Sequence, residues 1–252
     1  MKTNKDKNHG GRLKEEYRGM WAEYLCRFLE GYRKKGVTVK RISIQNGPAA
    51  VQIWDSCVYS AGEGKEFLRD YLYPALCAHG LTDLEIFIWD HNKERLLERA
   101  LETIDADTDR MITGMAFHWY SGDHFEALQM AHEKFPKKKL LFSEGCVEHS
   151  KFAAKDQLAD ARMYGHDITG DLNHGACAFI DWCILLNEKG GSNHVDNFVD
   201  VTAFLRPDGQ VAVVLMNRTA ERMPVYLRMR GEVLPVTVEQ DAIMTVLIDP
   251  GQ

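Results

Sequence analysis

The sequence predicts an α/β protein that begins with alternating strands and helices and ends in a small antiparallel β piece. Apolar, β-branched segments alternate with segments of helical spacing as far as about residue 198. From residue 199 onward, strand patterns follow one another with only turns between them. Repeated strand–helix units indicate a parallel sheet, either an open doubly wound sheet or a barrel. Polar and aromatic residues also gather where each of the earlier strands ends.

The boundaries in the alternating part follow from the spacing of apolar residues. After a polar segment over residues 1–12, aromatic and aliphatic residues recur at helical spacing from Leu13 to Tyr32. A helix over 67–80 contains Pro74, where we expect a kink. Strands are expected in chain order at 37–45, 84–89, 111–117, 140–143 and 176–186, with further helices at 92–101, 123–128 and 153–173.

Three local signals refine these elements. Asn92 is expected to cap the helix that follows it, because a side-chain oxygen can accept from free N–H groups of a first helical turn. Asp123, with Glu126 three residues later, resembles a capping box. The strand over 176–186 is almost wholly apolar and is therefore predicted to be buried on both faces.

The part after residue 199 has no helical pattern. Turns such as the one over 207–209 separate its strands, which predicts part of a β-sandwich. These strands are expected at 201–205, 210–217, 224–229 and 243–248. With the boundary placed at the loop over 190–193 or just after it, the predicted organisation is a polar segment (1–12), a strand–helix domain (13–198) and a β piece (199–252).

Composition excludes several classes of protein. A net charge of −6 over 252 residues gives no electrostatic reason to bind nucleic acid. No apolar run approaches the roughly 18–20 residues of a membrane span. The polar start lacks the apolar core of a signal peptide, so a cytoplasmic location is expected. The 6 cysteines form no CxxC pair and are expected to be buried free thiols; neither a metal nor a cofactor is indicated.

Residues suited to binding a sugar gather at the predicted strand ends. Carboxylates, amides and aromatic rings occur together there, and sugars have apolar faces and polar edges. In a (β/α) barrel the carboxyl ends of the strands form one face, which carries the active site. The segments are Gln45-Asn46, Trp89-Asp90, His118-Trp119-Tyr120, Ser143-Glu144 and Asp181-Trp182.

Each of these residues also has a structural interpretation. Glu144 could be a salt-bridged carboxylate, although an acid at the end of an apolar strand requires a specific partner. Asp90 could equally well cap the next helix. The other residues have simple alternatives too: a core histidine for His118, core aromatics for Trp119 and Trp182, and a loop residue for Asn193.

Seven segments, in order along the chain, resemble glycoside hydrolase family 30, the glucosylceramidase-like family. The resemblance implies a TIM barrel with a β-sandwich, a retaining mechanism, an acid/base glutamate after strand four and a nucleophile after strand seven. On that mapping Glu144 is the nucleophile and Asn46 holds the sugar 2-hydroxyl, while Asp90, His118, Trp119, Tyr120, Trp182 and Asn193 bind substrate. The matching segments are 44–48, 54–57, 89–92, 117–120, 143–146, 181–182 and 190–194.

The chain departs from the family pattern in two ways that affect activity. Gly47 stands where the family has the acid/base glutamate, within Asn-Glu-Pro. Asn46 and Pro48 keep the flanks of that motif, which predicts a suitable backbone for a glutamate there. Residues 1–4 resemble the segment after the third barrel strand, so only strands four to eight are expected. A non-catalytic relative that binds sugar is therefore the alternative prediction.

The expected partners follow from the same resemblance. The substrate would be a carbohydrate or a glycolipid that carries a β-linked sugar, and nucleic acid is not expected. Five strands of an eight-stranded barrel leave two open sheet edges, which favour association through unpaired backbone groups. We therefore expect a companion chain or a homo-oligomer, and poor solubility of the chain alone.

Overall fold

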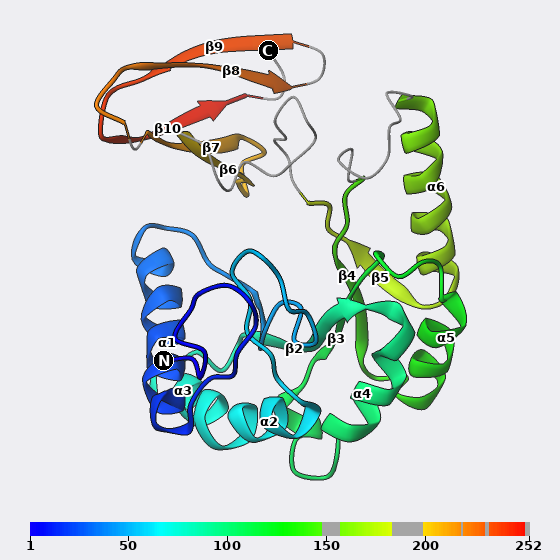
Figure 1. Cartoon of the computed structure of the whole chain (residues 1–252). Coiled ribbons are helices and arrows are strands. Elements are labelled where there is room, and N and C mark those ends of the chain that lie inside the picture. The colour runs from blue at the N-terminus through cyan, green and yellow to red at the C-terminus, as the bar shows by residue number, and fades with distance from the viewer. Residues whose placement is uncertain (148–156, 183–198, 218, 230–231, 250–252) are drawn as a thin grey trace. The chain divides into compact units, whose positions relative to one another are not determined.

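The computed structural model describes the chain in two compact units, which are treated separately. The α/β unit comprises Met1–Gly145 and Asp156–Trp182, and the β unit comprises Cys146–Lys155 and Cys183–Gln252 (Figure 1). The predicted boundary at 190–193 lies outside the described residues. Those described are residues 1–147, 157–182, 199–217, 219–229 and 232–249.

The α/β unit is built on a 5-stranded parallel sheet. The strands lie side by side in chain order, whereas a doubly wound sheet reverses its order at a switch point. The order therefore identifies a partial barrel. The strands are β1 (Arg41–Ser43), β2 (Glu85–Asn92), β3 (Gly114–His118), β4 (Lys139–Glu144) and β5 (Ala176–Phe179).

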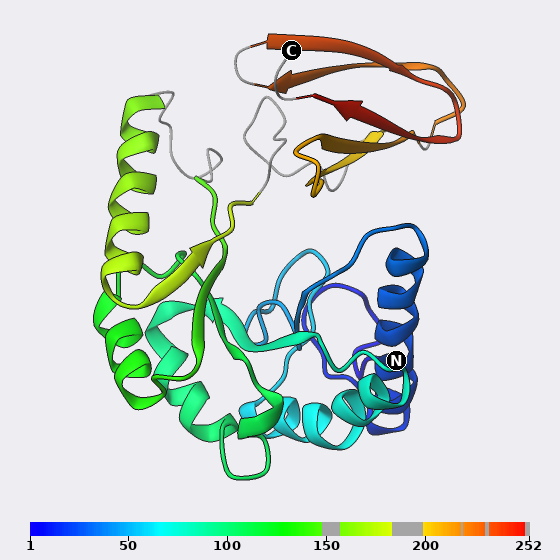
Figure 2. The ribbon, with the colours of Figure 1, turned by 180° about the vertical axis from the view of Figure 1, so that it is seen from behind.

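Helices cover the outer side of this curved sheet (Figures 1 and 2). The helix around Pro74 is irregular: a π-helix precedes it, and Pro74 lies in the first turn of the next α-helix, where its missing N–H is tolerated. The helical elements are η1 (Glu15–Tyr17), α1 (Arg18–Lys34), α2 (Ala61–Glu66), η2 (Phe67–Leu72), α3 (Tyr73–Ala78), η3 (Lys93–Arg95), α4 (Leu96–Thr103), η4 (Asp109–Met111), α5 (Phe125–Lys134) and α6 (Gln157–Asn173).

The two faces of the sheet are packed differently. On the helix side, Met115, Phe117 and Phe142 are fully buried, and each such side chain stabilises the fold by roughly 1.5–3 kcal/mol. Because side chains alternate along a strand, the residues between them face the inner side. There the buried cluster is much smaller and consists of Phe87, Ala116 and Leu141, with Ala178 packed against them.

Both predicted helix caps are wrong in their side-chain contacts. Asn92 occupies the cap position of η3, but its side chain makes no capping hydrogen bond. Helix α5 begins at Phe125, and its cap position is His124, which makes no side-chain capping bond either. Asp123 instead pairs with His166 of α6, 3.0 Å away, so the long-range contact replaces the local one.

Strand β5 is shorter and more exposed than predicted. It ends at Phe179, and Cys177 within it is exposed, so burial on both faces is wrong for the described part. Since β5 pairs only with β4 in the described sheet, one of its edges is uncovered by a described strand. Residues 183–186 of the predicted strand lie outside the described residues. The expected burial of cysteines likewise holds for Cys26 and Cys146 but fails for Cys77 and Cys177.

The β unit contains two small antiparallel sheets, ordered β10-β7-β6 and β8-β9. Its core includes Val213, Leu215, Leu227 and Val238. Strand β9 was not expected from the sequence, because Pro235 disfavours a strand and most of its residues are exposed. The strands are β6 (Val199–Leu205), β7 (Val211–Asn217), β8 (Met223–Met229), β9 (Glu232–Val238) and β10 (Ala242–Ile248).

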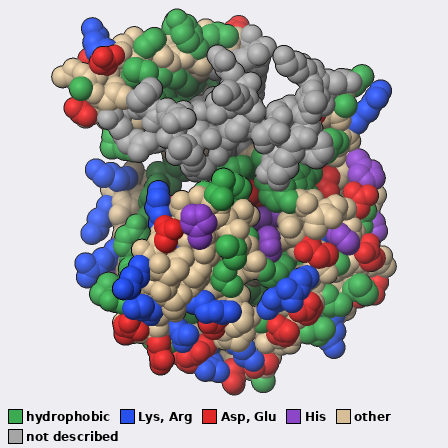
Figure 3. Space-filling view, viewed as in Figure 1, with side chains coloured by type: hydrophobic (Ala, Val, Ile, Leu, Met, Phe, Trp, Pro, Cys, Tyr) green, Lys and Arg blue, Asp and Glu red, His purple; other side chains and the backbone are tan. Residues whose placement is uncertain are grey.

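The described surface carries charges of both signs. On the face shown in Figure 3, acidic and basic side chains intermingle over the α/β unit. Among the described helices, none is both long and apolar enough to cross a membrane.

Candidate active site

The carboxyl ends of four strands bring the predicted site residues together. Asn46 follows β1, Asp90 lies near the end of β2, His118 ends β3 and Glu144 ends β4. In the sheet, His118 pairs with Asn92 on one side and with Glu144 on the other. Parallel strands place their carboxyl ends at one edge, so residues separated by almost a hundred positions become neighbours.

Glu144 is held through both of its carboxylate oxygens. Asn46 Nδ2 donates to Oε2 at 3.0 Å, and Tyr120 Oη donates to Oε1 at 3.1 Å. His118 Nδ1 lies 4.0 Å from Oε1. In the described part of the chain, no lysine or arginine forms an ion pair with this carboxylate. Two neutral donors, Asn46 and Tyr120, thus orient the Glu144 carboxylate, and His118 is the basic side chain nearest to it in the contacts given above.

Asp90 lies beneath this carboxylate and is only 7% exposed. Its Oδ1 is 3.1 Å from His118 Nε2 and 2.5 Å from Ser143 Oγ. Burial alone would raise the pKa of Asp90, but the hydrogen bond and charge of His118 and the Ser143 hydroxyl outweigh it, so the pKa is lowered. Asp90 therefore does not cap a helix, and its burial leaves little of the carboxylate within reach of a ligand.

Two β-bulges determine the side of the sheet to which these side chains point. The register between β2 and β3 shifts at Asp90, and that between β3 and β4 shifts at Ser143. Each strand thus carries one extra residue beside β3. Glu144 would otherwise share the helix side with Phe142, since side chains alternate. The extra Ser143 turns Glu144 to the side of His118, which explains how the two residues meet.

The backbone of β2 is strained where it reaches the site. Trp89 and Asp90 have φ angles of 72° and 57°, in the left-handed region. Such a conformation costs a residue other than glycine roughly 1–2 kcal/mol. The Asp90 carbonyl accepts a hydrogen bond from Gly47 N at 2.8 Å, and Trp89 Nε1 donates to the Asn92 carbonyl at 2.8 Å. These bonds hold β2 in a shape that the sequence did not predict.

Gly47 also lies in the left-handed region, with φ 56°. A Cβ added there would have its nearest neighbour at 3.5 Å, the Cβ of Ala50, so a side chain has room. The predicted suitability of this backbone for a glutamate is therefore wrong: the space is available, but the conformation favours glycine.

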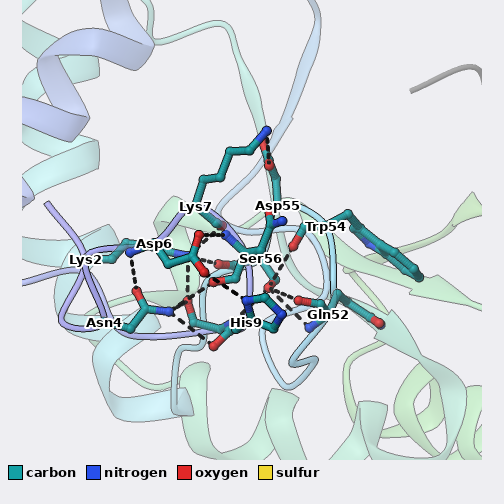
Figure 4. A network of polar contacts seen from close by, with 11 residues as sticks. Lys2, Asn4, Asp6, Lys7, His9, Gln52, Trp54, Asp55 and Ser56 are labelled. Carbon is teal, nitrogen blue, oxygen red and sulfur yellow. Dashed lines mark hydrogen bonds and ion pairs between the residues drawn. The ribbon is translucent and has the colours of Figure 1, made fainter. Parts of the chain in front are cut away.

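The segment after Gly47 is joined to the start of the chain by a polar network (Figure 4). Tyr59 N donates to the Pro48 carbonyl at 2.9 Å, which closes the loop between them. The Lys2 ammonium donates to the carbonyls of Lys7 at 2.7 Å and Gly10 at 2.6 Å. It also donates to the carbonyl of Ser56, so the two loops support each other.

The aromatic residues predicted for the site lie in different surroundings. Tyr120 is 37% exposed, and its ring lies edge-on to His118. Trp119 is half-buried and packs on Tyr164 of α6, with ring centroids 4.8 Å apart. Trp182 N donates to the Gly145 carbonyl at 3.0 Å, which places its backbone next to the end of β4. Asn193 lies outside the described residues.

Sequence reasoning gave no role to two residues of this cluster. Ser143 bonds Asp90, and the His91 ring centroid lies 6.0 Å from that of His118. Burial and the nearby His118 charge lower the pKa of His91, which favours its neutral form. Both residues belong to the predicted strand ends, but only the bulges determine which way they point.

A separate cavity of about 40 Å³ lies between β1, β2 and the helices around them. It is lined by Tyr59, Trp89 and Arg99, among others, and Glu144 does not line it. The chemistry of the strand ends is therefore not located in this cavity.

Two family models match the sequence of this chain. The model of the glycosyl hydrolase family 30 TIM-barrel domain matches residues 1–210, and that of the family's beta sandwich domain matches residues 185–246. The chain belongs to glycosyl hydrolase family 30. The resemblance of its seven sequence segments to this family is thereby confirmed.

Relatives within family 30 include glycosidases of different kinds. Lysosomal acid glucosylceramidase of Mus musculus is 27% identical over 90% of this chain and 56% of that protein. Endo-1,6-beta-D-glucanase neg1 of Aspergillus fumigatus is 26% identical over 72% of this chain and 36% of that protein. The solved structure of SrfJ from Salmonella typhimurium has a TM-score of 0.73 and 34% identity, over 99% of this chain and 66% of that chain.

The chain spans about half the length of curated relatives that it matches. The partial barrel of family 30 seen here therefore corresponds to only part of such proteins.

Proposed function

We propose that this chain binds a β-linked glucoside at the ends of β1 to β4 and that Glu144 attacks its anomeric carbon. The observation that carries the proposal is the pair of hydrogen bonds from Asn46 and Tyr120, one to each oxygen of Glu144. A glucosyl group is favoured because the names of relatives refer to glucosylceramide and to a glucan.

The proposed chemistry is retaining, but it lacks one of its two carboxyl groups. Attack by Glu144 forms a glycosyl ester as the bond to the leaving group breaks. A second carboxyl group about 5–5.5 Å away normally protonates the leaving oxygen and then activates water. Gly47 supplies no such group, and positioned acid/base catalysis is worth roughly 10²–10⁴-fold. The chain would therefore act only on substrates whose leaving group departs unaided.

A small external anion tests this proposal. With 2,4-dinitrophenyl glucoside as substrate, azide is expected to intercept the glycosyl ester and to raise turnover of the native chain. Gly47→Glu is expected to restore turnover without azide, on this substrate and on an ordinary glucoside. Gly47→Gln is the matched control, because it has the same backbone strain and no acid. If folded protein stays at the background rate in both arms, the proposed catalysis is wrong.

A second candidate function is a relative that binds sugar without hydrolysing it, or that pairs with another chain. Gly47 favours this candidate, and so do strands β1 and β5, which form the two edges of the described sheet. Saturable glucoside binding without turnover would support it. Light scattering tests association: a compact monomer with a cooperative melting transition would contradict a companion chain or a homo-oligomer.

A further inference from the structure

We infer that Asp90 is a positioning residue that locks the two β-bulges beside β3 and thereby sets the position of Glu144 relative to residue 47. This inference rests on the proposed role of Glu144 as nucleophile. Three sets of contacts carry it: those of the Asp90 side chain, those of its main chain, and the register of the sheet.

The Asp90 side chain contacts two neighbours of Glu144: Ser143, which precedes it in the chain, and His118, which pairs with it across the sheet. Ser143 precedes Glu144 and is the extra residue of the bulge in β4; its Oγ lies 2.5 Å from Asp90 Oδ1. His118 Nε2 lies 3.1 Å from the same oxygen. Asp90 is itself the extra residue of the bulge in β2. One carboxylate oxygen therefore links the two irregular strands across β3.

The same bonds determine which nitrogen of the His118 ring carries a hydrogen. An ionised carboxylate only accepts hydrogen bonds, and the same Asp90 oxygen also accepts from the Ser143 hydroxyl at 2.5 Å. Nε2 of His118 must therefore be the donor, which turns Nδ1 toward Glu144 Oε1 at 4.0 Å. Asp90 fixes the orientation of the ring that faces the nucleophile without touching the nucleophile itself.

The main chain of Asp90 holds the opposite side of the site. Its carbonyl accepts the hydrogen bond from Gly47 N at 2.8 Å, at the acid/base position of the family. The left-handed φ of 57° directs that carbonyl and side chain together, and aspartate, asparagine and glycine tolerate it better than other residues. The contacts of one buried residue thus span the two positions whose separation a retaining mechanism requires.

Covalent labelling of Glu144 provides the test. The probe is 2,4-dinitrophenyl 2-deoxy-2-fluoro-β-glucoside, and intact and peptide masses report the label. A Glu144 oxygen bonds to the anomeric carbon as the bond to dinitrophenolate breaks and its electron pair leaves with the phenolate. Because no proton is needed, the loss of acid at Gly47 does not prevent the reaction.

We expect Asp90→Asn to slow the maximal labelling rate by about 10-fold and Asp90→Gly by about 100-fold, the scale of a displacement of 1 Å. Glycine retains the left-handed backbone, so it removes the carboxylate alone. The concentration of probe at half-maximal rate should change less than threefold. Asp123→Asn is the matched control, because Asp123 also pairs with a histidine, 3.0 Å away but exposed, and should label like the native chain.

The outcomes separate this inference from the proposed function. If the native chain is not labelled, the proposed nucleophile is wrong and the inference falls with it. If the native chain is labelled and the folded Asp90 variants label equally fast, only the positioning role is wrong. Should neither Asp90 variant fold, Ser143→Ala removes one of the two links and should slow labelling by about 3–10-fold; an unchanged rate would overturn the inference.

Discussion

Two clusters of polar and charged side chains lie on opposite sides of the parallel sheet. The open cluster, at the strand ends, consists of Asn46, Asp90, His118, Tyr120 and Glu144. The closed cluster consists of Lys93, Asp167 and Asp171, on the helix side. The Glu144 side chain is 19% exposed, whereas that of Lys93 is fully buried. Both clusters have buried carboxylates, so burial and charge alone do not distinguish them. They differ in their partners: neutral side chains bond to the partly exposed Glu144, whereas one lysine faces both aspartates of the closed cluster.

The closed cluster pairs one lysine with two aspartates, so it carries an excess negative charge when both aspartates are ionised. The Lys93 ammonium lies 2.5 Å from Asp167 and 2.7 Å from Asp171, and 4.8 Å from the centroid of the Phe125 ring. One cation faces two carboxylates. Burial raises the pKa of Asp171 to about 7, against the opposing effect of Lys93 and with the charge of Asp167 adding to it. Below about pH 7, one of the two aspartates is protonated. The remaining carboxylate then balances the charge of Lys93.

The largest expected effect is on the open cluster. Glu144→Gln should abolish covalent labelling and any hydrolysis, by at least about 10⁴-fold, because an amide forms no glycosyl ester. The free energy of unfolding should change little, since a neutral side chain of the same shape replaces the carboxylate. Glu126→Gln on α5 is the control, with a side chain that is 70% exposed. Labelling that survives in the glutamine variant would show that the open cluster has no nucleophile at this position.

A substitution in the closed cluster should instead have its main effect on stability. Lys93→Met leaves two buried carboxylates without a cation and should lower the free energy of unfolding by about 3–5 kcal/mol. Urea unfolding measures the loss. Lys7→Met, with a side chain that is 78% exposed, should change stability by less than about 0.5 kcal/mol. Equal stability of the two variants would mean that the closed cluster does not hold the fold together.

The closed cluster should also make the stability of the protein depend on pH, through Asp171. In the folded protein, burial raises the pKa of Asp171 to about 7, above its ordinary value of 3.8. The stabilisation is therefore complete below about pH 4 and is lost as the pH rises through 7, on the order of 3 kcal/mol. His79 contributes with the same sign, because Glu30 and Glu23 raise its pKa. The difference between native protein and Asp171→Asn isolates the aspartate; parallel pH profiles would contradict its assignment.

These two clusters also show how far sequence reasoning extends. The meeting of Asn46, Tyr120 and Glu144 was predictable, because the carboxyl ends of parallel strands share one edge. The bulges were not, since no pattern distinguishes an extra residue in a strand from a regular one. Lys93 gave no signal either: a lysine just after a strand is usually exposed, and its partners lie more than seventy residues away.

In the fold too, features that depend on local residue spacing were predictable, whereas features that depend on contacts between distant residues were not. The order of the strands and helices followed from apolar spacing, but spacing did not decide between a doubly wound sheet and a barrel. Asp123 could cap a helix locally, but α5 begins only at Phe125, and Asp123 pairs with His166 of α6 instead. Strand β9 was missed although most of its residues favour a strand; Pro235 disfavours one, and the pairing with β8 accommodates it.

The smallest expected effect concerns the backbone of Gly47, which follows Asn46 of the open cluster. Gly47 has φ 56°, so Gly47→Ala should lower the free energy of unfolding by about 1 kcal/mol through backbone strain. Gly31→Ala is the matched control: Gly31 lies inside α1 with no atom within 4 Å of an added Cβ, and alanine should stabilise the helix by about 0.5–1 kcal/mol. Urea unfolding of both variants gives opposite signs if the strain is real. If Gly47→Ala is neutral, the loop relaxes at no cost, and a glutamate restored at this position would be limited by the rest of the pocket rather than by its own backbone.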